Sequence, residues 1–284
     1  MTPEDRIEQL IDEVLISVEN GADDATRLLV SDLTAFLETL SISGGAFVMD
    51  DIVATQLSQI NTVIASAINR STYPRAVAEV ARSLDEITRL AEEVLTNYNP
   101  NVKIDFDKMG VSQLRIAQVE TIVNNMTGDA LTVNVRNGIR QGIQRNVFAG
   151  AKLTDTKNFI REYLEKQPDQ KYARLTRYAH TYAQDGIMQY DGMIYDRFRQ
   201  EFEITHVQYI GSLIKDSRAQ CIRWINKYDG KIPMAKLQSE ITWANNNGSG
   251  MNPATTPASF CTYRGGYACR HKAIPIAIEE DEEL

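Results

Sequence analysis

The feature that most constrains this fold is one apolar seam in the second half of the chain. Its residues recur every three or four positions over 27 residues: Tyr172, Leu175, Ala179, Ala183, Ile187, Tyr190, Ile194 and Phe198. This period is that of an α-helix with one buried face, so we predict a helix of about seven turns over 170–200. Aromatic residues at this spacing normally face a core, and the tyrosines are expected there rather than in a binding stripe.

The first 150 residues carry further apolar stripes at helical spacing. These stripes predict successive helices around 7–18, 29–40, 53–68, 77–94, 111–126 and 130–148. Gly21 and the Ser-Gly-Gly run at 43–45 are the predicted breaks between the first three. Gly138 and Gly142 lie four residues apart on one helix face, which predicts a close helix contact.

The period changes from about 3.6 to 2 after Glu203, which predicts a strand over 205–213 with Val207, Tyr209 and Leu213 facing inward. A last strand is expected over 273–278, confined to a sheet edge by Pro275.

The chain is therefore predicted to be mostly α with a small C-terminal α+β domain. Its expected organisation is a helical region (1–150), a domain that includes the long helix and the small sheet (151–278), and an acidic tail (279–284).

Composition excludes several classes of protein. No apolar stretch of the 284 residues approaches the ~18–20 uncharged residues of a membrane span. Three cysteines are too few for a secreted disulfide scaffold. The first 100 residues hold 17 acidic and 6 basic side chains, whereas 101–200 and 201–278 each carry a net charge of +4. Nucleic acid should be repelled by the first third and tolerated by the rest.

All three cysteines lie in the last quarter of the chain, together with a histidine. Three thiolates and one imidazole form a valid tetrahedral zinc set, so Cys221, Cys261, Cys269 and His271 are candidate metal ligands. The spacing lacks the Cys-x2-Cys knuckle of a typical zinc site. A disulfide or plain thiols therefore remain open alternatives, and a structural zinc is the one cofactor to be tested.

Catalytic motifs are scarce. The chain contains no Gly-x-Ser-x-Gly elbow, phosphate-binding loop, dinucleotide-binding turn or His-Glu-x-x-His helix. We therefore expect a protein that is not an enzyme, and keep an enzyme or toxin of unknown activity as a second alternative.

Three segments of the last third carry a resemblance: YIGSLIKDSRAQC (209–221), NKYDGKI (226–232) and RGGYACRHKAIPI (264–276). Together with the long helix before them, they resemble the Mu F-like minor head, or head-morphogenesis, proteins of tailed bacteriophages, over roughly 150–278. The matching motif residues are Asp216, Arg218, Asp229, Gly230, Lys231, Gly265, Gly266, Tyr267, Cys269, Arg270 and His271.

The resemblance implies a virion component that acts in head assembly, inside the capsid or at the portal vertex, after synthesis in the host cytoplasm. Its expected partners are the portal, other head proteins and copies of itself, with no membrane. Contact with packaged DNA defines the first alternative, a metal-binding, DNA-associated internal virion protein. The motif itself is expected to maintain the fold, with Arg270 and His271 pairing with Asp216.

Overall fold

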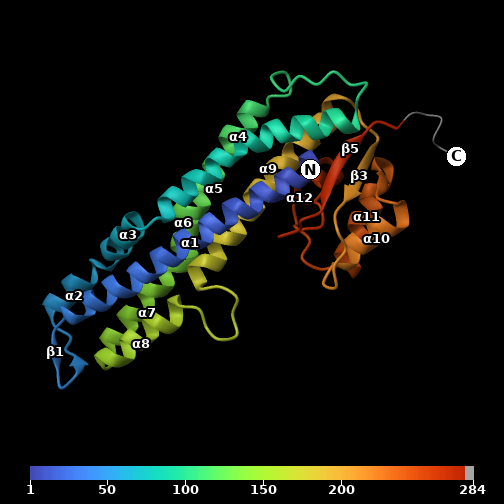
Figure 1. Cartoon of the computed structure of the whole chain (residues 1–284). Helices are drawn as coiled ribbons and strands as arrows, with labels where there is room; N and C mark the ends of the chain where they lie inside the picture. The colour runs from blue at the N-terminus through green and yellow to red at the C-terminus, as the bar shows by residue number, and fades with distance from the viewer. Residues whose placement is uncertain (279–284) are drawn as a thin grey trace. The chain divides into compact units, whose positions relative to one another are not determined.

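The computed structural model describes residues 1–278, and Figure 1 shows helices followed by a small C-terminal sheet. The helices are α1 (Pro3–Glu38), α2 (Asp51–Leu57), α3 (Ile60–Arg70), α4 (Tyr73–Tyr98), α5 (Val111–Thr127), α6 (Asp129–Leu131), α7 (Asn137–Phe148), α8 (Leu153–Leu164), α9 (Arg174–Glu201), α10 (Ala219–Tyr228), α11 (Met234–Asn247) and α12 (Phe260–Tyr263). The strands are β1 (Ile42–Ser43), β2 (Ala46–Phe47), β3 (His206–Ile210), β4 (Lys231–Pro233) and β5 (Lys272–Ile276). The predicted fold class, mostly α with a small C-terminal α+β part, is confirmed. No helix among the described residues carries an apolar stretch long enough to span a bilayer.

Contacts divide the chain into two units, each assembled from segments far apart in sequence. The first unit comprises Met1–Ile11, Arg82–Glu120 and the chain from Gln184 onward. The second comprises Asp12–Ala81 and Thr121–Ala183. Helices α1, α4, α5 and α9 contribute residues to both units. The separation of 1–150 from 151–278 as folding domains remains a prediction.

Within the second unit, glycines mark close helix contacts. The break predicted at Gly21 is wrong, because α1 continues through it to Glu38. A Cβ on Gly21 would lie 3.0 Å from the Ala76 Cβ, so this glycine lets α4 approach α1. The prediction for Gly138 and Gly142 is confirmed: the Tyr163 and Phe159 side chains of α8 occupy the space that their Cβ atoms would fill.

Helix boundaries elsewhere in this unit also differ from the predictions. The stripe over 53–68 forms two helices, α2 and α3, separated at Ser58 and Gln59. The helix expected around 130–148 begins with α6 and a π-helical turn over Thr132–Arg136 before α7. Apolar periodicity passes through both interruptions, since neither changes which face is buried.

The three-stranded sheet of the first unit is antiparallel, with β3 between β4 and β5. Val207 on β3 lies opposite Ile232 on β4 and Pro275 on β5. Strand β5 is thus an edge strand carrying proline, as predicted. Helix α10 contacts β3 and β4, and α12 contacts β5.

The buried face of β3 organises the core of the sheet. Val207 and Tyr209 are both buried, and the Tyr209 ring packs edge-on against Trp224 of α10 at 5.2 Å between centroids. The predicted strand was too long, because the chain turns at Gly211 (φ +144°). The inward orientation predicted for Leu213 is wrong as a result, since that side chain is 40% exposed.

We predict that Val207→Asp destabilises the protein by about 3 kcal/mol or more, the cost of burying an unpaired charge or losing its core contacts. Leu213→Asp is the matched control, and should change the free energy of unfolding by about 0.5 kcal/mol or less because its side chain is half exposed. Denaturant unfolding measures both values. Equal effects of the two substitutions would contradict the placement of β3.

Candidate metal centre

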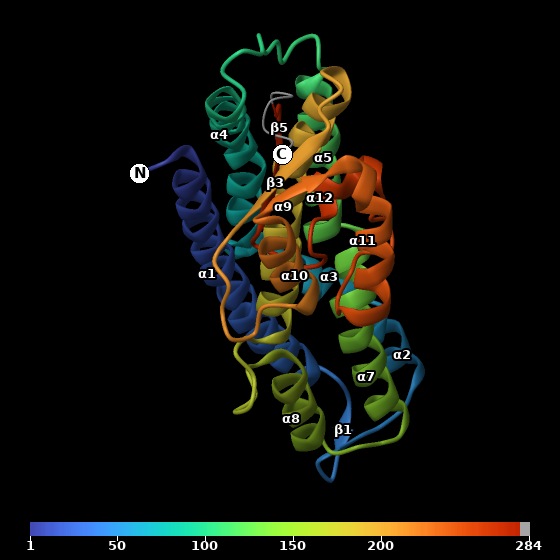
Figure 2. The same cartoon turned by 90° about the vertical axis from the view of Figure 1, so that its right-hand side faces the viewer.

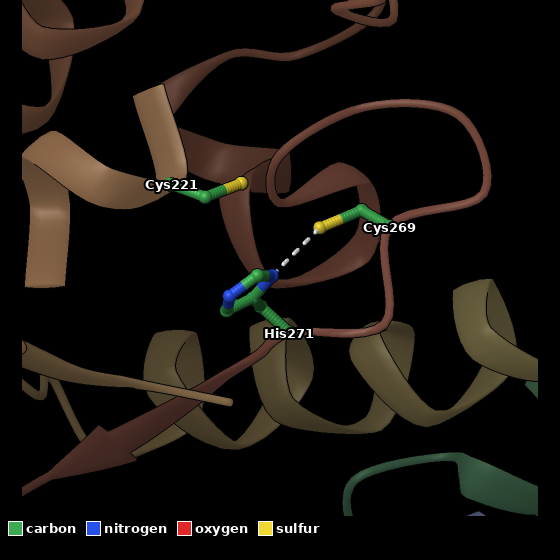
Figure 3. Close-up of side chains that lie close together, drawn as sticks. All are labelled: Cys221, Cys269 and His271. Atoms are coloured by element: carbon green, nitrogen blue, oxygen red, sulfur yellow. Dashed lines mark hydrogen bonds between the residues drawn. The ribbon is translucent and has the colours of Figure 1, made fainter. Parts of the chain in front are cut away.

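Two thiols and one imidazole meet in the interior of the first unit. Figure 3 shows Cys221 on α10, Cys269 on the loop before β5, and His271 just before that strand, with their side chains directed toward one another. The two sulfurs and one ring nitrogen lie within 4.8 Å of one another, and all three residues are buried. The Cys269 Sγ and His271 Nδ1 atoms are 3.6 Å apart.

Cys261, the fourth predicted ligand, does not join this group. It lies on α12, fully buried, and its backbone N–H donates to the Asp196 carboxylate of α9 at 3.2 Å. Burial, followed by the charge of Asp196, raises the pKa of the Cys261 thiol. The structure thus brings together three of the four predicted ligands. The spacing of the cysteines in the sequence could not show that Cys261 lies outside the group formed by Cys221, Cys269 and His271.

Two glycines make room for the cluster. A Cβ on Gly265 would lie 2.7 Å from the sulfur of Cys221 and 2.7 Å from that of Cys269. A Cβ on Gly211 would lie 2.6 Å from the His271 ring. Any side chain at either position would displace a group of the cluster.

Arg218 and Gln220 hold the loop that carries Cys269. The Arg218 guanidinium donates to the carbonyl oxygens of Gly265 at 2.8 Å and Tyr267 at 2.5 Å. The buried Gln220 amide donates to the Gly265 carbonyl as well, at 3.0 Å. The Tyr267 N–H in turn donates to the Gly250 carbonyl at 3.0 Å. The start of α10 therefore fixes the loop through its backbone.

The Asp-Gly-Lys motif forms the turn from α10 to β4. Asp229 and Gly230 both have positive φ angles, of 49° and 73°. The Gly230 carbonyl accepts from the Tyr209 N–H at 2.6 Å, and Lys231 pairs with Gln208. Through these two contacts the turn also binds β3, the strand that carries Tyr209.

The expected pairing of His271 with Asp216 is wrong. Asp216 is exposed on the loop before α10, and the His271 imidazole points to the Cys269 thiol instead. Arg270 is exposed as well. Gly211 and Gly265 permit this arrangement, because their missing side chains leave the space that the imidazole and the thiols fill.

The two thiols of the cluster differ in ionisation. Hydrogen bonding with Cys221, and then with His271 and Tyr209, outweighs burial and lowers the pKa of Cys269. The hydrogen bond with Cys269, together with burial, raises the pKa of Cys221. The proton of Cys269 is therefore lost more readily than that of Cys221, and a cation that bound both sulfurs would displace the remaining proton.

The donor set and its spacing fit a metal ion. Thiolate and imidazole are the ligands that zinc prefers, and a tetrahedral zinc places its sulfur and nitrogen ligands about 3.6 Å apart. The Cys269–His271 separation equals this value. Cys221, Cys269 and His271 could therefore hold a metal.

Several residues of this region were not predicted to belong to the candidate site. Tyr209 was predicted as core only, and Gln220 was not singled out. Two aspartates of α9 were also missed: Asp196 accepts from Thr262 N–H at 2.9 Å, and Asp185 accepts from Ala268 N–H at 2.8 Å. Burial raises the pKa of both carboxyl groups. The available signal was the presence of acidic residues beside the apolar seam of a predicted core helix.

In comparisons with protein-family models, curated proteins and solved structures, nothing matches this chain.

A buried glutamate fastens α10, the helix of Cys221, to α11. The Glu240 side chain is 2% exposed and accepts from Arg223 at 2.7 Å, Lys227 at 2.6 Å and Tyr228 at 2.8 Å. Burial acts to raise its pKa, but these three donors prevail and lower the pKa of Glu240 to about 2. The folded-state pKa is thus below that of the unfolded chain. Its stabilisation is complete above about pH 4.5 and is lost as the pH falls toward about 2.

We predict that Glu240→Gln lowers the free energy of unfolding by on the order of 2 kcal/mol at pH 7, and that this difference shrinks between about pH 4.5 and pH 2. Denaturant unfolding of both proteins at several pH values measures it. Glu201→Gln, at an exposed position on α9, serves as the control and should change the free energy of unfolding by about 0.5 kcal/mol or less at pH 7. A difference that stays constant down to pH 2 would show that the carboxylate charge is not what stabilises this contact.

Proposed function

We propose that this chain is a structural minor head protein of a tailed bacteriophage, acting in head assembly at or near the portal inside the capsid. The observation that carries the proposal is the convergence of the three segments that bear the resemblance. Arg218 from the first segment and Gly265 from the third share a hydrogen bond, and the turn at Gly230 binds Tyr209. The three segments of the resemblance thus meet around the cluster.

The contacts of these residues support a structural role rather than catalysis. Arg218 and Gln220 bind backbone carbonyl oxygens of the chain itself. Cys221, Cys269 and His271 are all buried. Polar groups that bind backbone carbonyl oxygens hold the fold in place, and buried thiols are not open to a substrate.

We further propose that the cluster holds a structural zinc ion. Cys221, Cys269 and His271 would supply two thiolates and an imidazole, joining α10 to the loop that leads from α12 into β5. When bound, zinc would contribute folding energy by cross-linking these two segments. Its affinity should weaken as the pH falls, because protons compete for the thiolates.

We predict about one zinc per chain in protein purified without chelator, measured by elemental mass spectrometry. Cys269→Ser should lose the metal and lower the free energy of unfolding. Cys261→Ala is the matched control: it removes a buried thiol outside the cluster and should retain the metal. Full-length protein that contains no metal, or equal metal content in both variants, would refute the zinc proposal.

For the role itself, we predict that purified particles of the phage that encodes this chain contain it at a fixed, low ratio to the portal protein. Quantitative mass spectrometry of gradient-purified particles measures that ratio. Absence of the chain from the particles would overturn the proposal. Retention of the purified chain on duplex DNA that weakens steeply with salt would favour the DNA-associated alternative.

A further inference from the structure

A fourth side chain points its polar atom at the cluster. The Tyr209 hydroxyl lies 3.3 Å from the Cys221 sulfur and 3.6 Å from the Cys269 sulfur. Tyr209 comes from the central strand β3, whereas the thiols come from α10 and the loop before β5. Four donor atoms, supplied by β3, α10 and the loop before β5, therefore lie close together in the interior.

We propose that the Tyr209 oxygen is the fourth ligand of the metal held by Cys221, Cys269 and His271. This inference rests on the zinc proposal above and deepens it. The sequence predicted Cys261 as the fourth ligand, but Cys261 lies beside Asp196. The Tyr209 oxygen, from the sheet, takes its place. The resulting centre has two sulfurs, one nitrogen and one oxygen.

The separations between donor atoms support this assignment. In a tetrahedral zinc site, oxygen and sulfur ligands lie about 3.5 Å apart, because each is 2.0–2.3 Å from the ion. Tyr209 lies at 3.3 and 3.6 Å from the two sulfurs, and Cys269 lies at 3.6 Å from the imidazole. These three distances match three of the six edges of one coordination tetrahedron.

The surroundings of Tyr209 hold its oxygen in this position. The ring stacks on the His271 imidazole, with 5.3 Å between centroids and 11° between planes. Trp224 packs against it edge-on at 5.2 Å, and Phe260 lies at 6.2 Å. With the side chain 1% exposed and fixed by three aromatic neighbours, no rearrangement is needed to present the oxygen.

Gly265 shows independently that the donor atoms converge. A Cβ built on this residue would lie 2.9 Å from the Tyr209 oxygen and 2.7 Å from each of the Cys221 and Cys269 sulfurs. One small volume beside the Gly265 backbone is thus bounded by all three atoms. A side chain there would collide with each of them, so the glycine leaves the donors free to face one another.

A hydroxyl buried in this way needs a strong partner. The described partners of the Tyr209 oxygen are two sulfurs, and thiols are weak hydrogen-bonding groups. Coordination to a cation would offset the cost of burying the oxygen, with its proton released to solvent. A site with four protein ligands holds no exchangeable water, so it is structural.

The test is a Co²⁺ titration of the full chain after its metal has been removed by a chelator under reducing conditions. Tyr209→Phe keeps the ring and removes only the oxygen. Tyr190→Phe is the matched control, since it removes another buried hydroxyl of the same unit, one that bonds Thr88 at 2.7 Å. We expect Tyr209→Phe to bind Co²⁺ roughly 10-fold or more weakly, with shifted visible bands, and Tyr190→Phe to match the wild type.

The outcomes separate the two proposals. Wild-type protein that gives no thiolate-to-cobalt absorption would overturn the metal proposal and this inference with it. Strong absorption that is identical in wild type and Tyr209→Phe would overturn this inference alone. Should Tyr209→Phe fail to fold, Zn²⁺ is added to the metal-free wild-type protein. The ultraviolet difference bands of an ionised tyrosine are then expected, and their absence would overturn the assignment.

Discussion

The attachment of the C-terminal loop to α9 is the interaction on which the candidate centre depends. The buried Asp196 carboxylate accepts hydrogen bonds from the N–H groups of Cys261 and Thr262 and from the Thr262 hydroxyl, at the start of α12. One turn earlier on α9, Gly192 lets the Cys261 carbonyl approach so closely that a Cβ would lie 2.1 Å from it. Asp185 then holds Ala268 N–H, next to Cys269. The helix therefore fixes both ends of the segment that presents Gly265 and Cys269.

A buried charge is costly unless it has a partner. Here the partners are shared between α9 and the segment from α12 to β5. Lys272, at the start of β5, lies 3.8 Å from Asp191, and both side chains are almost fully buried. Arg264 donates from its buried guanidinium to the Met188 carbonyl. Because an isolated buried charge is strongly unfavourable, the Lys272–Asp191 ion pair and the Arg264 hydrogen bond favour this position of the segment on the helix. The polar contacts thus determine where the segment lies along α9, while the apolar seam of α9 provides the buried apolar surface.

The sequence predicted those parts of the fold that depend on periodicity and on local stereochemistry. The apolar seam predicted α9 within a few residues, and Pro275 predicted that the last strand, β5, lies at a sheet edge. Gly21 was misjudged because a glycine that allows close helix packing looks the same in sequence as one that ends a helix. Three of four metal candidates were brought together, but Cys261 was not. The partner of each thiol is set by how α12 and its turn pack on α9, which spacing along the chain does not encode.

The size of the sheet explains why a cross-link would matter in this region. Strands β3, β4 and β5 have only five, three and five residues, and long loops connect the elements around them. Cys221 and Cys269 are far apart in sequence, so joining them through one ion closes a long loop and restricts the unfolded chain. The same ion would bind the central strand through Tyr209, together with the helix and the edge strand. A centre of this composition would therefore stabilise the sheet from within.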